Sequence, residues 1–269
     1  MKIALITKDF MPIRGGAERY GYNLATSLSK LGEDVHVFCR KIETELEKNF
    51  NIHKVPDEHY FFESKQKAFI RECKKMLSVS DYDLVYSLAH FYPSDIYRVG
   101  DGVHLHWSGL KYPNPICRAI WENCSASSRR TKYIEKKIYN PITGSRFFIT
   151  NSKLVKNHVM EYHKIPEENI SVVYNGVDSN IFHPEEKAKK EEFLQKEKIP
   201  LEKMVVLFVA NNWSRKGLKT LLLGSSNLLR KNEAILIVVG KGNIKFWSNF
   251  AKKLGIKENI FFTGATNNV

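Results

Sequence analysis

Short apolar runs alternate with amphipathic stretches along roughly the first 180 residues. Residues 2–7 (KIALIT) form one such run, and after a Gly-Gly turn Leu24 and Leu28 repeat at the spacing of one helix face. This pattern stops at Gly32, where a helix C-cap commonly has glycine, and residues 34–39 (DVHVFC) resume as a strand. Because these strands are continuously apolar, we expect a parallel sheet with both faces covered.

The same alternation continues through this part of the chain. Further strands are expected at residues 83–87, 96–99, 146–150 and 170–174. Helical spacing is expected at residues 63–77, 115–138 and 153–162. The pattern therefore predicts that residues 1–180 form one doubly wound α/β domain.

A second α/β pattern follows a charged connector at residues 185–198. Its predicted strands are residues 204–210, 234–239 and 259–263, and its predicted helices are residues 216–229 and 245–254. We therefore expect residues 181–269 to be a linker and a second domain. Three strands are few beside the usual five or six, so we expect the chain to stop inside this domain. Leu221, Leu222 and residues 235–239 would then be partly unburied.

Composition and charge narrow the classes of function. With 43% hydrophobic residues the chain is globular and not disordered, and its net charge of +13 favours polyanionic partners. No run approaches the roughly 18–20 apolar residues that span a bilayer, and the N-terminus has no signal-peptide core. The four cysteines lack a CxxC pair, which favours reduced thiols. We expect a cytoplasmic protein, with peripheral attachment to the inner membrane as a second option.

Chemistry is suggested by a series of short motifs. Gly15-Gly16, between the first strand and the first helix, lets backbone N–H groups approach an anion, although such a turn is by itself more often structural. The ordered series is GGAER (15–19), NS (151–152), YNGVD (174–178), WSRKG (213–217) and VGKG (239–242). Together these motifs resemble the retaining glycosyltransferases of family 4, which have the GT-B fold. Within the family, YRVGD (97–101) is similar to the lipopolysaccharide core glucosyltransferases that use UDP-glucose.

The resemblance implies two Rossmann-like domains facing a cleft that holds the active site. Arg215 and Lys216 match the pair that binds the donor diphosphate, and fixed cations and helix ends would stabilise the departing phosphate without a metal. Gly15, Gly16 and Gly240 would approach the nucleotide sugar from the two domains. No cofactor or metal is expected, and the partners would be a nucleotide sugar and a glycan or lipid-linked glycan acceptor.

The acceptor side is expected in the loop after residues 96–99. The resemblance places an acidic residue or a histidine near the transferred sugar there, so Asp101 and His104 are the candidate catalytic residues. A carboxylate at this place could accept the proton of the acceptor hydroxyl or stabilise positive charge on the anomeric carbon. Alternatively, His104 and His106 belong to an ordinary surface loop. Glu18 either contacts the acceptor or only favours the start of its helix.

Residues 107–137 interleave aromatic and basic side chains, Arg129, Arg130 and Lys132 among them. This composition suits an anionic membrane surface. The alternative is a solvated helix whose aromatic residues lie in the core. The same features suit RNA, but the signatures of common RNA-binding modules are missing.

One motif of the family has no counterpart. Family members carry a paired-glutamate motif, E-x7-E, after a strand equivalent to residues 259–263, and no residue here can be assigned to it. The leading hypothesis is a retaining glycosyltransferase that moves a hexose, most simply glucose, to a lipopolysaccharide or other cell-envelope glycan. Its rivals are an inactive, truncated sugar- or nucleotide-binding remnant and a basic nucleic-acid-binding protein.

Overall fold

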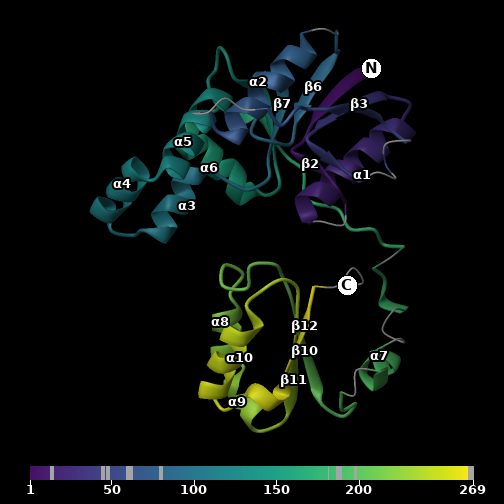
Figure 1. Cartoon of the computed structure of the whole chain (residues 1–269), viewed down its shortest axis with the longest axis vertical. Helices are drawn as coiled ribbons and strands as arrows, with labels where there is room; N and C mark the ends of the chain where they lie inside the picture. Colours follow the sequence, from purple (N-terminus) through teal and green to yellow (C-terminus); the bar gives the residue numbers. More distant parts are fainter. Residues whose placement is uncertain are drawn as a thin grey trace. The chain divides into compact units, whose positions relative to one another are not determined.

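The chain forms two compact units, Met1–Gly176 and Val177–Val269 (Figure 1). The computed structural model describes residues 1–12, 15–43, 46, 49–58, 63–78, 81–180, 182–185, 190–196 and 199–265. The first unit ends at Gly176, whereas the sequence pattern places the end of the first domain near residue 180.

The first unit is built on a parallel sheet. Over its described residues, seven strands pair in the order β5-β3-β1-β6-β7-β8-β9. Their bounds are β1 Lys2–Ile6, β3 Asp34–Cys39, β5 Asn51–Lys54, β6 Leu84–Ser87, β7 Ser94–Val99, β8 Ser145–Thr150 and β9 Ile170–Val172. A short pair, β2 (Asp9–Phe10) and β4 (Lys41–Ile42), follows β1 and β3. Since all these pairings are parallel, the carboxyl ends of the strands meet at one edge of the sheet.

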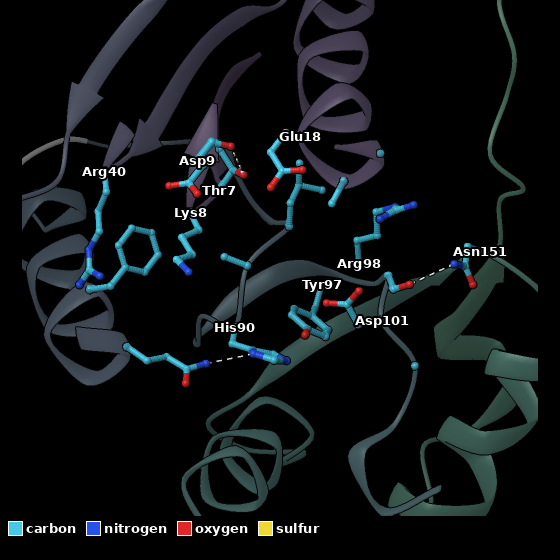
Figure 2. Close-up of a pocket in the computed structure, with 18 of the residues that line it drawn as sticks. Thr7, Lys8, Asp9, Glu18, Arg40, His90, Tyr97, Arg98, Asp101 and Asn151 are labelled. Carbon is cyan, nitrogen blue, oxygen red and sulfur yellow. Dashed lines mark hydrogen bonds between the residues drawn. The ribbon is translucent and has the colours of Figure 1, made fainter. Parts of the chain in front are cut away.

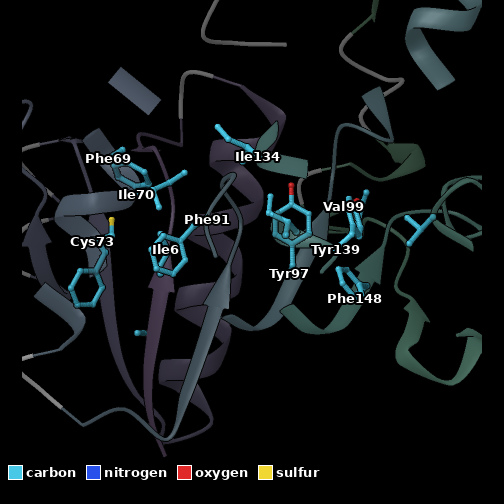
Figure 3. Close-up of a cluster of buried hydrophobic side chains, with 14 of the residues drawn as sticks. Ile6, Phe69, Ile70, Cys73, Phe91, Tyr97, Val99, Ile134, Tyr139 and Phe148 are labelled. Atoms are coloured by element: carbon cyan, nitrogen blue, oxygen red, sulfur yellow. The ribbon is translucent and has the colours of Figure 1, made fainter. Parts of the chain in front are cut away.

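Helices cover both faces of this sheet, as the sequence predicts. They are α1 Gly16–Lys30, α2 Lys65–Leu77, α3 His104–Lys111, α4 Pro115–Cys124, α5 Ala126–Ile138 and α6 Lys153–His163, with a 3-10 turn at Glu167–Asn169. Ile6 of β1 packs in a core with Phe69 of α2 (Figure 3), whereas the preceding residue, Leu5, packs in a core with Ala25 of α1. Adjacent strand residues point to opposite faces, so α1 and α2 lie on opposite sides of the sheet.

The single helix expected at residues 115–138 is two helices. Ser125 has an extended backbone, and its N–H donates to the Trp121 carbonyl at 2.9 Å, which ends α4. Its hydroxyl oxygen accepts the Ser128 N–H at 3.3 Å, which begins α5. Serine is a favoured N-cap because its oxygen satisfies a free N–H of the first turn. The break therefore follows from one side chain in the middle of a helical pattern.

The loop expected around His104 and His106 is also helical. The N-cap of α3 is Val103, whose side chain cannot cap the helix. Instead the distant Glu135 carboxylate accepts the His104 N–H at 3.0 Å. Because this cap comes from α5, no local pattern signals the start of α3.

The second unit repeats the α/β arrangement on a smaller scale. Its described residues include a parallel sheet in the order β10-β11-β12. The elements are α7 Lys190–Lys196, β10 Met204–Val209, α8 Leu218–Gly224, α9 Ser226–Arg230, β11 Ala234–Val239, α10 Ile244–Lys253, a 3-10 turn at Lys257–Asn259 and β12 Ile260–Gly264. The helix expected at residues 216–229 thus starts at Leu218 and divides after Gly224.

The expectation that the core of the second unit is partly unburied is wrong for most of the residues named. Leu222 and Leu236 are fully buried, and all of β11 is buried. One face of β11 packs with α8, α9 and α10, while the other packs with Leu194 of α7. Leu221 is only partly buried. Exposed apolar side chains occur on β10, where Met204 and Leu207 are 60% and 61% exposed, and on the outer faces of the helices.

Candidate functional site

A polar pocket of about 680 Å³ lies in the first unit, at the carboxyl edge of the sheet (Figure 2). Segments that follow β1, β3, β6, β7 and β8 line it, together with the first turns of α1 and α2. Its lining includes five basic side chains (Lys8, Arg40, Lys65, Arg98 and Arg130) and three acidic ones (Asp9, Glu18 and Asp101). Clefts at this edge of open α/β sheets are the usual place for ligands.

Asp101 stands at this pocket on a loop that is held from two sides. The Asn151 side-chain amide donates to the Gly100 carbonyl at 3.1 Å, and the Trp107 indole N–H donates to the Asp101 carbonyl at 2.9 Å. The Asp101 residue itself is exposed. The backbone is therefore fixed while the carboxylate is left accessible to a ligand.

His104 does not line the pocket. Its imidazole Nε2 lies 2.8 Å from the Ser128 hydroxyl, and its ring packs near Trp121 at 5.9 Å between centroids. The neighbouring His106 stacks on His158 of α6, with 3.6 Å between ring centroids. Of the two predicted catalytic side chains, the structure thus brings only Asp101 to the pocket.

The glycine turn before α1 is partly at the pocket. Gly16 and Glu18 line it, whereas Gly15 is the N-cap of α1 and is absent from the lining. A Cβ added at Gly16 would meet nothing within 4 Å, so this backbone faces open space. The first turn of α1 therefore presents bare backbone and one carboxylate to a ligand.

Arg98 and His90 also line the pocket, although the sequence pattern did not identify either of them as a site residue. Arg98 is the penultimate residue of β7 and is 8% exposed; its guanidinium lies over the Tyr20 ring at 3.6 Å and donates to Asn175 Oδ1 at 2.8 Å. Asn175 belongs to the YNGVD motif, which explains why that motif lies beside the site. The signal that could have found Arg98 is a charge inside an apolar strand.

His90, after β6, also lines the pocket. Its Nδ1 lies 3.0 Å from the Gln66 side-chain nitrogen, and its ring is stacked near Tyr97. Burial lowers the pKa of His90, although the nearby Glu135 and Asp101 carboxylates raise it in part. Burial likewise raises the pKa of Tyr97 above its usual range. Both rings therefore stay neutral and can act in the pocket only as hydrogen-bonding groups.

In the second unit, Arg215 and Lys216 occupy the turn between β10 and α8. Both are exposed, and the Asn212 side chain and carbonyl accept their backbone N–H groups at 3.3 and 3.1 Å. The helix begins after Gly217, which has φ +89° and reverses the chain there. The two cationic side chains are thus accessible on the turn that leads into α8.

Gly240 follows β11 with φ +114°. A Cβ there would overlap the Ala210 carbonyl oxygen, so the close approach of the β10 and β11 ends requires glycine. The Gly240 N–H donates to the Gly264 carbonyl at 2.8 Å. Gly240 therefore shapes the turn, and its own amide is already used.

The three basic residues assigned to an acceptor or membrane do not form one free surface. Arg129 is exposed, Arg130 lines the pocket, and the Lys132 ammonium pairs with Glu122 at 2.9 Å. Exposed apolar side chains lie on α3 and α4 instead: Trp107 is 51%, Leu110 59%, Ile116 70% and Ile120 59% exposed. Figure 1 shows these two helices projecting from the sheet-bearing part of the first unit.

No three His, Cys, Asp or Glu side chains in the described ranges are grouped to hold a metal ion. In that same part of the chain, no helix combines the length and apolarity needed to cross a bilayer. Metal independence stays a prediction.

The chain is similar to known glycosyltransferases in both sequence and fold. An uncharacterized glycosyltransferase of Methanocaldococcus jannaschii is 25% identical, over 99% of this chain and 70% of its own length. The lipopolysaccharide glucosyltransferase WaaG of Escherichia coli K12 is 21% identical over 100% of this chain and 71% of its own.

Solved structures agree with these sequence relatives. A crystal structure of WaaG, a glycosyltransferase involved in lipopolysaccharide biosynthesis, superposes with a TM-score of 0.80 at 17% identity, over 98% of this chain and 70% of that one. Anabaena HepE, solved in complex with UDP-glucose, gives a TM-score of 0.65 at 17% identity, over 99% and 69%. The parallel α/β fold thus matches the GT-B glycosyltransferases, as predicted.

Family profiles cover nearly the whole chain. Residues 189–269 match Glycosyl transferases group 1, and residues 14–181 match Glycosyltransferase Family 4. The group 1 match begins on the charged connector and takes in Arg215, Lys216 and Gly240, while the family 4 match contains the pocket residues from Gly16 to Asn175. The chain therefore belongs to glycosyltransferase family 4, and it is a glycosyltransferase.

Proposed function

We propose that this glycosyltransferase moves a hexose, glucose in the simplest case, from a UDP-sugar to a cell-envelope glycan with retention of anomeric configuration. Two relatives support the choice of substrates: HepE was solved with UDP-glucose, and WaaG is named a lipopolysaccharide glucosyltransferase. The observation that carries the proposal is Asp101, held by its backbone at a polar pocket with its carboxylate exposed.

The two units have different roles in this proposal. The first binds the acceptor in its pocket, with Asp101 and Glu18 directed to hydroxyl groups. The second binds the donor, with the exposed Arg215 and Lys216 on the diphosphate and the turn at Gly240 beside it. Gly15 and Gly16 bring the N-terminus of α1 toward the sugar-diphosphate, where the helix dipole favours negative charge.

Retention sets the geometry of the reaction. The acceptor oxygen bonds to the anomeric carbon on the face from which the phosphate oxygen leaves. In this proposal the Asp101 carboxylate accepts the proton that the attacking hydroxyl loses, and before that transfer it stabilises positive charge on the anomeric carbon. Negative charge grows on the departing diphosphate, and Arg215 and Lys216 stabilise it through charge-assisted hydrogen bonds. His104 does not line the pocket, so its contribution is to position α3 and, with it, the Asp101 loop.

An acceptor embedded in a membrane requires the enzyme to approach the bilayer. We propose that α3 and α4 make this contact from the cytoplasmic side, because Trp107, Ile116 and Ile120 are exposed apolar side chains on projecting helices. Lys111 and Arg118 lie on the same two helices and suit anionic headgroups.

A thermal-shift panel of UDP-, GDP- and ADP-sugars, followed by a transfer assay, tests the proposal. A ligand at about 100 times its Kd adds about 2.7 kcal/mol to the free energy of unfolding. We expect UDP-sugars to give the largest shift. If no nucleotide sugar shifts the transition, and the protein instead binds nucleic acid with a steep salt dependence, the proposal is wrong.

A further inference from the structure

Three cations from distant parts of the sequence meet at one end of the pocket. Lys8 follows β1, Arg40 follows β3, and Lys65 begins α2. The Arg40 backbone N–H donates to the Lys8 carbonyl at 3.0 Å, and the Arg40 guanidinium donates to the Lys65 carbonyl. We name Lys8, Arg40 and Lys65 the cationic end of the pocket.

Arg40 is a rigid, enclosed cation. Its side chain is 8% exposed, its guanidinium lies over the Phe69 ring at 5.3 Å, and its Nη1 is 3.3 Å from Asp57 Oδ1. Its Nε is buried and, within the described part of the chain, has no hydrogen-bond partner. A buried donor without an acceptor is costly, so this N–H group is suited to a ligand atom.

The other two cations are accessible. Figure 2 shows the Lys8 side chain pointing into the pocket, and no ion pair joins its ammonium to a described residue. The Lys65 side chain is 66% exposed, and its ammonium makes a long contact of 3.7 Å with Asp57 Oδ2. Lys65 is also the first residue of α2, whose first turn contains no acidic residue, so the positive end of that helix dipole adds to the cationic end. Among the carboxylates, Asp57 contacts Arg40 and Lys65, while Asp9 and Glu18 line the pocket.

The opposite side of the pocket offers a ligand hydrogen-bonding groups in place of free cations. In Figure 2, Arg40 and Lys8 lie on one side, while Asp101 and Arg98 lie on the other. The Arg98 charge is already engaged with Tyr20 and Asn175. The groups left for a ligand on that side are therefore the Asp101 carboxylate and neighbouring polar atoms, which suit hydroxyl groups.

We propose that the acceptor of this enzyme is anionic and that its phosphate or carboxylate group binds the cationic end, while its reacting hydroxyl lies toward Asp101. This inference rests on the proposed function and specifies the substrate class of the same pocket. The pocket lining has five basic and three acidic side chains, so the pocket as a whole favours the binding of an anion. The separation of the cationic end from Asp101 sets the orientation in which the acceptor binds.

Calorimetric titration with glucose 6-phosphate, and with neutral glucose as its comparison, tests this inference. We expect wild-type protein to bind the phosphate ester at least about ten-fold more tightly than glucose. Lys8→Ala and Lys65→Ala should each remove most of this preference, and Lys8→Arg should keep it. Lys75→Ala is the matched control, because Lys75 lies on the same helix α2, is exposed, pairs with Glu72 at 3.2 Å and does not line the pocket. Arg40 is left intact because its loss also removes packing on Phe69.

A second titration, with UDP, separates the two possible sources of phosphate. The Lys8→Ala/Lys65→Ala double variant should bind UDP as the wild type does. If UDP binding weakens as much as glucose 6-phosphate binding, the cationic end holds the donor diphosphate and the inference is wrong. Equal affinity of wild-type protein for glucose and glucose 6-phosphate also overturns it. Failure of the wild type to bind UDP contradicts the proposed function alone, since the phosphate-ester comparison does not use the donor.

Discussion

The Gln66 side-chain nitrogen lies 3.0 Å from Nδ1 of His90, across the pocket edge between α2 and the segment after β6. An amide NH₂ group can only donate, so Nδ1 accepts and the neutral ring carries its proton on Nε2. Together with burial, which lowers the His90 pKa, this hydrogen bond keeps the imidazole neutral. His90 therefore offers one N–H donor to a ligand.

This arrangement predicts that acid destabilises the fold. The pKa of His90 is lower in the folded chain than the ordinary value of about 6.5. Below that pH the unfolded chain binds a proton that the folded chain does not, so the free energy of unfolding falls as the pH drops from about 6.5 through the folded pKa. Burial lowers the pKa of His53 and His158 in the same direction. Thermal unfolding between pH 7.5 and 5.5 should show the loss, and His90→Gln should make it smaller.

The variant Gln66→Glu should have the opposite effect on the His90 pKa. A carboxylate in place of the amide would accept from Nδ1–H and raise the His90 pKa. An NMR titration of the His90 ring should then show a midpoint above that of the wild type. An unchanged midpoint would mean that Gln66 does not determine the protonation of His90.

Asp101→Asn should lower kcat by about 10²-fold or more, because a carboxylate at the acceptor hydroxyl acts mainly in the transition state. UDP affinity should be unchanged. Asn151→Ala should give a smaller loss of kcat, since Asn151 only holds the loop at the Gly100 carbonyl. Asp81→Asn, an exposed carboxylate away from the pocket, is the control. Full turnover by a folded Asp101→Asn variant would show that the carboxylate is not used.

Donor binding is predicted to depend on the turn before α8. Arg215→Ala and Lys216→Ala should each weaken UDP-sugar binding by about 1.5 kcal/mol or more, the value of a charge-assisted hydrogen bond. Lys219→Ala is the matched control, because Lys219 is an exposed cation within α8 itself. Calorimetry measures the UDP-sugar affinity of all three variants. Wild-type affinity in the Arg215→Ala/Lys216→Ala double variant would show that neither residue binds the donor.

The periodic elements could be predicted from the sequence, and those stabilised by distant groups could not. β3 is predicted at residues 34–39 because its apolar run indicates a buried strand, and the structure has it at Asp34–Cys39. β5 (NIHK) is a polar edge strand with no such run, and α3 is capped by Glu135 from α5. In both cases the determining contact is remote in sequence.

The pocket residues divide in the same way, into those that a local motif predicts and those that tertiary contacts bring together. Gly16 and Asp101 were expected there because each belongs to a motif at the end of a predicted strand, and contact with the acceptor was one of the two alternatives for Glu18. Arg40 and Lys65 have no motif. Their approach depends on β3 pairing beside β1 and on the start of α2 lying against Arg40. Strand order is a tertiary property, so composition and spacing do not contain it.

Membrane contact is predicted to depend on the exposed apolar residues of α3 and α4 more than on Arg129, Arg130 and Lys132. Only Arg129 of those three is exposed, whereas Arg130 lines the pocket and Lys132 is paired with Glu122. Burying one large apolar side chain contributes about 1.5–3 kcal/mol, compared with about 1 kcal/mol for one cation near an anionic surface.

The variant Ile116→Ser/Ile120→Ser should therefore reduce co-sedimentation with anionic vesicles more than Arg129→Ser does. The matched control is Ile142→Ser, because Ile142 is 89% exposed but lies on the turn before β8. The effect should persist at high salt, since apolar burial is not screened, whereas the smaller effect of Arg129→Ser should fade. If the wild type does not sediment with anionic vesicles even at low salt, or if Ile142→Ser reduces binding equally, α3 and α4 are not the membrane contact and their exposed side chains serve another partner.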